Sequence, residues 1–249
     1  MSKIGALCIA HYGREWLHWA VRSVQDQVDG VFVFYTNTPS HGHQTNVQCP
    51  ETRQMIIDSI QGMNVNWHDC GPFSHEGAHR DFAEKAMADM GYDHLLIVDA
   101  DEIWDPFLLE KFIAFGVESP ARHVCVGMRH FWRSLKWVCD DDCEPNRMVN
   151  VKHTGGDAYY PLDGGRVYHA GYAQSVKLMA YKISIHGHLG EWRNDWWQEK
   201  FLKWRPGSDI TDVHPTNLNF WTPAPYVDND NKLMKLVYDH PYRNMEVIP

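Results

Sequence analysis

Short apolar runs alternate with segments of helical periodicity over the first part of the chain. Ile4–Ala10, Gly30–Tyr35 and Leu95–Val98 are apolar, of strand length and bounded by polar or turn residues, so each predicts a buried strand. Arg14–Gln27 and Ala78–Met90 space their apolar residues three and four apart, which predicts helices. Strands alternating with helices are typical of βαβ units. We therefore expect an α/β fold with a mostly parallel sheet flanked by helices.

The remaining predicted elements are shorter or less regular. They are helices over Thr52–Ile60, Leu108–Phe115, Ser175–Ser184, Trp192–Trp204 and Asn231–Tyr238, and strands over Val65–Trp67, Val124–Met128 and Val167–Tyr172. The composition of Asp140–Asp142, Gly155–Gly165 and Thr211–Pro225 predicts loops or irregular structure.

Three carboxylates directly follow the Leu95–Val98 strand. Asp99 and Asp101 are two residues apart, so on an extended backbone they point the same way, and Glu102 comes next. Acids at the end of a buried strand are costly unless a cation lies beside them. Two such carboxylates suit a hard divalent cation that keeps positions open for phosphate oxygens, and parallel sheets bind ligands at this edge. A solvated acidic turn before a helix at Asp105-Pro106 explains the same spacing.

Composition and charge bound the class of protein. The chain has 249 residues, of which 44% are hydrophobic and 22% charged, as in an ordinary soluble domain. It shows neither a bilayer-spanning run nor a signal-peptide pattern, so we expect a cytoplasmic protein, in the host cytoplasm if a phage encodes it. The six cysteines lack CxxC spacing, which favours free thiols.

Taken together, these segments resemble a known family. Met1–Trp104 resembles the nucleotide-sugar-binding half of a GT-A glycosyltransferase, and most of all the family 2-like members. The resemblance is carried by the first strand and helix, by Ala78-His79-Arg80-Asp81 at a helix start, and by VDADE at Val98–Glu102. The downstream stretch VYHAGYAQSVKLMAYK, Val167–Lys182, resembles the H-x-G-[YW]…M…K segment of the same group. The likeness is patchy between residues 120 and 165.

The resemblance implies a metal-dependent transfer of a sugar, favouring a UDP-sugar donor, to a hydroxyl acceptor. Residues 1–120 would bind the nucleotide-sugar, and 121–249 would bind the acceptor and complete the metal site of the same domain. Asp99 and Asp101 would hold Mn²⁺ or Mg²⁺ against the diphosphate, and His169 would complete the shell, an imidazole that favours Mn²⁺. The alternatives are that His169 is a buried, hydrogen-bonded histidine, or that His186-Gly-His188, which fits the pattern less well, supplies the ligand.

The resemblance also assigns the nucleotide to the ends of the first two strands. The base would lie at the end of the first strand, against Ala10, His11 and Tyr12. Asn37 would lie near the uracil or ribose, but many members carry an acid there, which leaves the nucleotide open. Arg80, at a helix start, would bind phosphate, and a salt bridge to Glu84 is the alternative.

An inverting transferase needs a base for the acceptor hydroxyl, usually a carboxylate. Asp141 and Asp142 are favoured because the Asp140–Asp142 run follows an aromatic and basic segment that could hold an acceptor. Other acids that qualify by type are Asp157, Asp163 and Glu191. A solvated acidic turn is the structural alternative for Asp140–Asp142.

Two acceptors stay open at this point, a glycan hydroxyl and a hydroxymethylated pyrimidine in DNA. Between Ala121 and Pro206 there are 13 Lys/Arg against 9 Asp/Glu, whereas the remainder has 10 against 23. The basic side chains Lys177, Lys182, Arg193, Lys200, Lys203 and Arg205 interleave there with Trp192, Trp196, Trp197 and Trp204. That mixture suits phosphate and base contacts, although the same side chains can also cover a tryptophan core. A metal-dependent hydrolase of nucleotide-sugars or phosphoesters would use the same acids, and a lectin-like module is a more distant alternative.

Overall fold

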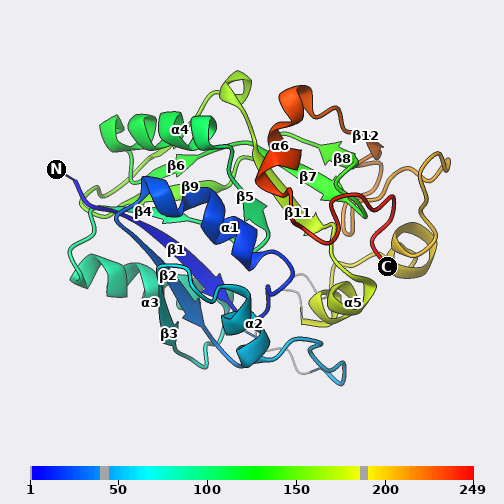
Figure 1. The fold of residues 1–249 in the computed structure, drawn as a ribbon, viewed down its shortest axis with the longest axis horizontal. Helices are drawn as coiled ribbons and strands as arrows, with labels where there is room; N and C mark the ends of the chain where they lie inside the picture. The colour runs from blue at the N-terminus through cyan, green and yellow to red at the C-terminus, as the bar shows by residue number, and fades with distance from the viewer. Residues whose placement is uncertain (1, 40–44, 186–189) are drawn as a thin grey trace.

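A computed structural model describes residues 2–39, 45–185 and 190–249, and within them seven strands form the main sheet (Figure 1). Its order is β10-β6-β9-β4-β1-β2-β3. These strands span Ile4–Ala10 (β1), Gly30–Tyr35 (β2), Val65–Asp69 (β3), His94–Ile97 (β4), His123–Cys125 (β6), Asn146–Asn150 (β9) and Asp157–Tyr159 (β10). β1 pairs in parallel with β2 and β4, β2 with β3, and β10 with β6, while β9 is antiparallel to β4 and β6. The predicted mostly parallel α/β sheet is confirmed.

Helices cover both faces of this sheet. The α-helices of the described chain are Leu17–Val24 (α1), Arg53–Ser59 (α2), Glu76–Asp89 (α3), Pro106–Glu118 (α4), Val176–Ile185 (α5) and Lys232–Leu236 (α6). Alternate residues of β1 point to opposite faces, as in any strand. Ala6 and Cys8 pack into a cluster with residues of α1, α2 and α4, whereas Leu7 packs with Ala83 and Met87 of α3. The sheet therefore lies between two helical layers.

A smaller sheet packs beside the main one. Within the described residues it has the order β12-β8-β7-β11-β5, made of Glu102–Ile103 (β5), Met128–Trp132 (β7), Trp137–Asp140 (β8), Val167–Tyr172 (β11) and Ala224–Pro225 (β12). β11 runs parallel to β7, and the other pairs are antiparallel. β5 directly follows the acidic end of β4, so pairing between His169 and Glu102 brings β11 against that end.

Several boundaries differ from the sequence prediction. Val124–Met128 was predicted as one strand, but β6 ends at Cys125 and β7 begins at Met128. The predicted Gly155–Gly165 loop contains β10 and a 3₁₀ turn at Leu162–Gly164. The predicted Trp192–Trp204 helix is reduced to a π-helical segment, Trp196–Phe201. Its tryptophans still share one cluster, because Trp196 and Trp204 are buried with Trp132 and Trp221. Shorter 3₁₀ turns lie at Gln25–Gln27 and Asn229–Asn231.

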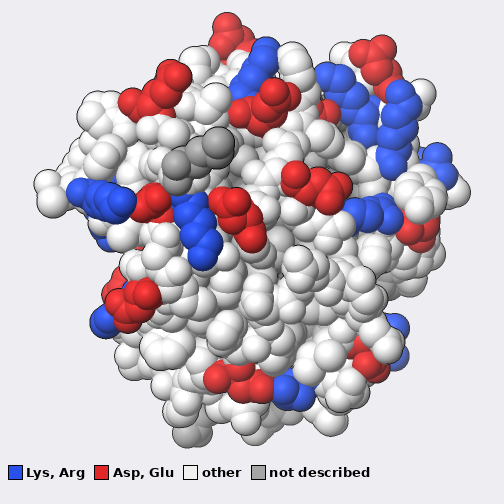
Figure 2. Space-filling view, turned by 60° about the vertical axis from the view of Figure 1, so that its left-hand side comes forward, with Lys and Arg blue, Asp and Glu red and all other residues white. Residues whose placement is uncertain are grey.

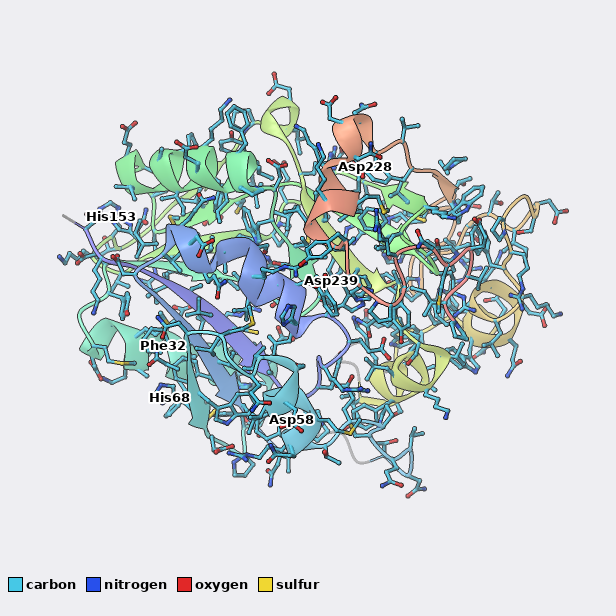
Figure 3. The ribbon with its side chains drawn as sticks, viewed as in Figure 1. Phe32, Asp58, His68, His153, Asp228 and Asp239 are labelled. Atoms are coloured by element: carbon cyan, nitrogen blue, oxygen red, sulfur yellow. The ribbon has the colours of Figure 1, made fainter. Side chains whose placement is uncertain are left out.

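The C-terminal segment is hydrogen-bonded to α1. Figure 3 shows Asp239 beside α1, where its carboxylate accepts hydrogen bonds from Trp19 Nε1 and from the Arg22 guanidinium, both at 2.8–2.9 Å. Asp228 lies before α6 and accepts from the backbone N–H groups of Leu233 and Met234. The Asp239 contacts therefore hold the segment after α6 against α1.

Two further observations concern the cysteines and membranes. All six cysteines are unpaired in the structure. Among the described residues, no helix combines the length and the apolar character needed to cross a bilayer.

Candidate functional site

A cavity of about 340 Å³ opens at the carboxyl ends of β1 and β4. Parallel strands end at the same edge of a sheet, and this is where such sheets bind ligands. β11, α5 and the start of α3 complete the wall. The polar lining includes His11, Tyr12, Glu76, His79, Asp99, Asp101, His169, Gln174 and Lys182. The structure thus brings the predicted Asp99, Asp101 and His169 to one cavity.

Arg147 of β9 holds the acidic end of β4 together. Its Nη2 donates to Asp99 Oδ2 at 2.7 Å, and its Nε donates to Glu102 Oε1 at 2.8 Å. The Glu102 side chain is fully buried and that of Arg147 is 7% exposed. Burial raises the pKa of Glu102 to about 7, with Arg147 opposing that rise. Burial alone would also raise the pKa of Asp99, but the positive charges of Arg147 and Arg80 outweigh it and hold that pKa below its usual value.

Asp101 is held by the segment that follows β11. Its Oδ2 accepts from Gln174 Nε2 at 2.8 Å and from Lys182 Nζ at 3.2 Å, while its Oδ1 faces His169 Nε2 at 3.5 Å. Burial alone would raise the pKa of Asp101, but Lys182 and His169 outweigh it, and the pKa lies well below its usual range. Asp101 is therefore an anion at neutral pH. The sequence offered Lys182 as one of several basic side chains suited to phosphate contacts, and in the structure it pairs with Asp101.

Two histidines connect Asp101 with Asp141. His169 Nδ1 lies 2.8 Å from His130 Nδ1, and His130 Nε2 lies 3.5 Å from Asp141 Oδ1. Trp221 Nε1 donates to Asp141 Oδ2 at 2.8 Å. Burial would raise the pKa of Asp141, yet hydrogen bonds from His130 and from the Cys143 backbone N–H lower it to about 2. Asp101, His169, His130 and Asp141 therefore form one chain of contacts.

The two carboxylates predicted as bases lie in different surroundings. The Asp141 side chain is 6% exposed, whereas that of Asp142 is 95% exposed and lies 3.9 Å from Arg166. Asp157, another candidate, pairs with His123 on the far strands of the main sheet. Asp163 belongs to a 3₁₀ turn, Glu191 is exposed, and His186-Gly-His188 lies outside the described residues.

Only some of the residues predicted to contact the nucleoside lie at the cavity. Ala10, His11 and Tyr12 line the cavity. His11 Nδ1 lies 2.9 Å from the Thr36 carbonyl oxygen and its Nε2 lies 2.5 Å from the Tyr181 hydroxyl. Burial lowers the pKa of His11, so the ring is neutral at pH 7. Asn37 is exposed, and the described lining of the cavity does not include it.

Arg80 lies beside the cavity rather than against Glu84. Its Nη2 donates to Glu76 Oε1 at 3.0 Å and is 3.9 Å from Asp99 Oδ1. Glu84 faces Arg122 instead, at 3.6 Å, so the salt bridge that the sequence offered as the alternative for Arg80 is wrong. A guanidinium beside Asp99 can still meet a phosphate group.

The residues at the cavity fit a hard divalent cation. Arg147 occupies one oxygen of Asp99, and the other, Oδ1, accepts no hydrogen bond from the described residues. Asp101 Oδ1 and His169 Nε2 are 3.5 Å apart, a separation that two ligands of one metal ion can adopt. Two carboxylate oxygens and one imidazole suit Mn²⁺ or Mg²⁺ when phosphate oxygens supply further ligands. The three side chains are not drawn together as closely as those of a closed metal site.

The fold and this cavity define an α/β protein with a cluster of acids at the ligand-binding edge of its sheet. No family model and no curated protein matches the chain. One similar solved structure is that of glucosyl-3-phosphoglycerate synthase from Mycobacterium tuberculosis in complex with Mn²⁺, UDP and phosphoglyceric acid. The similarity covers 53% of this chain and 44% of the synthase chain, with 13% sequence identity and a TM-score of 0.35.

Two other solved structures are similar to a comparable extent. A protein described as a nucleotide-diphospho-sugar transferase from Desulfovibrio desulfuricans G20 has 10% identity, covers 60% of this chain and 63% of its own, and has a TM-score of 0.37. Residues 1–349 of S. aureus TarS have 14% identity, coverages of 51% and 36%, and a TM-score of 0.34. The chain spans less than two thirds of each of these proteins, so its own residues have to carry the functional argument.

Proposed function

We propose that this protein transfers a glycosyl group from a nucleotide-diphosphate sugar to a hydroxyl acceptor, with Mn²⁺ or Mg²⁺ as cofactor. The observation that carries the proposal is the placement of Asp99 and Asp101 at the end of a parallel strand, inside one cavity with His169. Each acid is fixed by a cation through one oxygen. The other oxygens, Asp99 Oδ1 and Asp101 Oδ1, lie 3.9 Å from Arg80 Nη2 and 3.5 Å from His169 Nε2. The end of β1, at Ala10, His11 and Tyr12, would take the nucleoside.

Some residues of the site would bind the cation, and others would stabilise negative charge. Asp99, Asp101 and His169 would hold the cation, which when bound would neutralise the diphosphate leaving group as the glycosidic bond breaks. Arg147 keeps Asp99 ionised and oriented. Lys182 and Arg80 lie beside the same acids and would meet the negative charge that develops on the leaving diphosphate. Asn37 as a ribose or uracil contact stays a prediction.

The base for the acceptor hydroxyl stays a prediction too. Asp141 has a pKa of about 2, and so low a value makes a carboxylate a weak general base near neutral pH. Asp142 is solvent-exposed and free to approach an acceptor that enters from that side. Replacing Asp142 by Asn should lower kcat while leaving nucleotide binding intact if it is the base, and unchanged kcat would remove it from that role.

We infer a sugar or other small hydroxyl acceptor rather than DNA. Trp196 and Trp204, which the sequence offered as base-stacking side chains, are buried in the aromatic cluster. Lys203 pairs with Glu199 at 2.6 Å, and Lys200 donates to the Thr211 carbonyl oxygen at 2.9 Å. On the face drawn in Figure 2, acidic side chains lie among the basic ones, and the basic side chains are most closely grouped at its upper right.

The test is a turnover assay with labelled UDP-sugars, with and without an oligosaccharide acceptor. We expect transfer that EDTA abolishes and Mn²⁺ restores, and we expect Asp101→Asn to stay inactive at any Mn²⁺ concentration. Sugar released equally without acceptor would show a hydrolase. Full transfer in EDTA would refute the metal assignment, and binding of donor without any turnover would refute the enzyme.

A further inference from the structure

A second group of metal-ligating side chains lies beyond the two histidines from the cavity. Ligand atoms of His130, Asp141 and Cys143 all lie within 4.8 Å of one another, and this is the one such group of three in the described residues. The β7–β8 pairing brings them together, because His130 is opposite Cys139 and Asp141 follows two residues later. None of these three side chains belongs to the donor site proposed above.

The spacing suits a tetrahedral metal ion. His130 Nε2 and Asp141 Oδ1 are 3.5 Å apart. Two ligands at roughly 2.0–2.1 Å from a tetrahedral zinc ion are about 3.4 Å from each other. An imidazole, a carboxylate and a thiolate form a donor set that suits Zn²⁺, whereas Mg²⁺ and Ca²⁺ prefer oxygen alone.

The hydrogen-bond partners of these three candidate ligands resemble those that surround the ligands of known metal sites. Histidine ligands usually pair their second ring nitrogen with an acceptor, and carboxylate ligands are themselves hydrogen-bonded. His130 Nδ1 contacts His169 Nδ1 at 2.8 Å, and Asp141 Oδ2 accepts from Trp221 Nε1 at 2.8 Å. Trp221 has a φ of +63°, an uncommon conformation for a bulky residue, and in it the indole N–H reaches Asp141.

The site opens on one side. Asp141 and Cys143 line a second cavity, together with Arg166 and His214. Catalytic zinc sites typically have three protein ligands and one position left for water or substrate. We propose that His130, Asp141 and Cys143 bind a zinc-class transition-metal ion, with its fourth position facing this second cavity.

The contact between His130 Nδ1 and His169 Nδ1, 2.8 Å long, places this second site next to the donor site. A cation held by His130 would repel a second cation held by His169 across this contact, so binding at the two sites should be mutually unfavourable. This coupling rests on the proposed function, whereas the zinc site itself does not.

The experiment measures metal binding by the full chain without nucleotide. We expect Zn²⁺ to bind with one site fewer in Cys143→Ser and in Asp141→Asn than in the natural protein. Co²⁺ should give a thiolate charge-transfer band that Cys143→Ser abolishes. Cys49→Ser and Asp157→Asn are the matched controls, because both residues lie outside the second cavity, and both variants should bind zinc as the natural protein does. Trp221→Phe, which removes only the outer N–H, should weaken binding about 10–100-fold.

Two results would overturn the site. One is a cobalt band that persists in Cys143→Ser, and the other is unchanged zinc stoichiometry in Asp141→Asn with its thermal unfolding unaltered. Because these measurements use no donor or acceptor, a protein without transferase activity can still bind zinc here, and an active transferase can lack the site. In an active protein, Zn²⁺ should raise the Mn²⁺ concentration needed for half-maximal transfer, and this shift should vanish in Cys143→Ser. A shift of the same size in Cys143→Ser would refute the coupling.

Discussion

Replacing Arg147 by Met tests how the acidic end of β4 is stabilised. The substitution leaves Glu102 fully buried without the guanidinium that now donates to both of its oxygens. Removing one partner of a buried ion pair typically costs about 3–5 kcal/mol, because the remaining charge has no compensation. That loss is a large part of the roughly 5–15 kcal/mol that stabilises a typical domain. We expect urea unfolding at pH 8 to show a loss in this range.

The stability loss of Arg147→Met should depend on pH, in a direction that the pKa of Glu102 determines. Burial places the pKa of Glu102 above its unfolded value even with Arg147 present, and losing Arg147 removes an opposing effect. The folded variant then binds the proton more tightly than the unfolded chain, so its stability falls as pH rises above the unfolded pKa of about 4.3. The loss measured for Arg147→Met should therefore be smaller at pH 5 than at pH 8.

A second substitution provides the control. Glu102→Gln combined with Arg147→Met replaces the charge by a neutral amide and should recover at least half of the lost stability. Measured together with both single variants, the double variant completes a thermodynamic cycle. A single-variant loss below about 1 kcal/mol, or a double variant no more stable than Arg147→Met, would refute the idea that this ion pair stabilises the strand end.

Three further predictions concern other parts of the molecule. Burial lowers the pKa of His240 to about 4, so the unfolded chain takes up a proton first and stability should fall by roughly 2–3 kcal/mol between pH 7 and pH 4.5. His240→Gln should flatten that part of the urea-derived stability curve, and parallel curves for the two proteins would contradict the assignment. His169→Ala should raise the Mn²⁺ concentration needed for activity at an unchanged melting temperature, whereas a sharp fall in melting temperature with unchanged Mn²⁺ dependence would indicate a purely structural histidine. Charge reversal at Lys200 and Lys203 should leave transfer to an oligosaccharide insensitive to salt, and transfer to hydroxymethylated DNA with a steep salt dependence would overturn the acceptor inference.

The sequence predicted the central strands well because their signal is local. Ile4–Ala10 and Gly30–Tyr35 are apolar runs with polar ends, and the structure places β1 and β2 over the same residues. The Asn146–Asn150 strand gave no such signal, since Arg147 and Asn150 interrupt its apolar pattern. Their polarity is explained by long-range contacts. Arg147 reaches Asp99 and Glu102, and the Asn150 amide donates to the Ala121 carbonyl oxygen.

The same difference between local and long-range information applies to the site. That Asp99 and Asp101 face a cavity follows from their position after a parallel strand. Gln174 and Lys182 could not be assigned to Asp101 from spacing, because that contact requires α5 to fold back across the end of β4. His130 was not predicted either, since only the parallel pairing of β7 with β11 places it opposite His169.

Charge balance at the strand end predicts when the proposed donor site would take up a metal ion. The cluster holds three acids, Asp99, Asp101 and Glu102, against two cations that contact them closely, Arg147 and Lys182. Those cations already occupy one oxygen of Asp99 and one of Asp101, so the protein alone offers a divalent cation few ligands. A diphosphate adds the missing oxygens and negative charge, which Lys182 and the nearby Arg80 can also meet. The ion and the nucleotide-sugar should therefore bind together, each raising the affinity of the site for the other by the same factor.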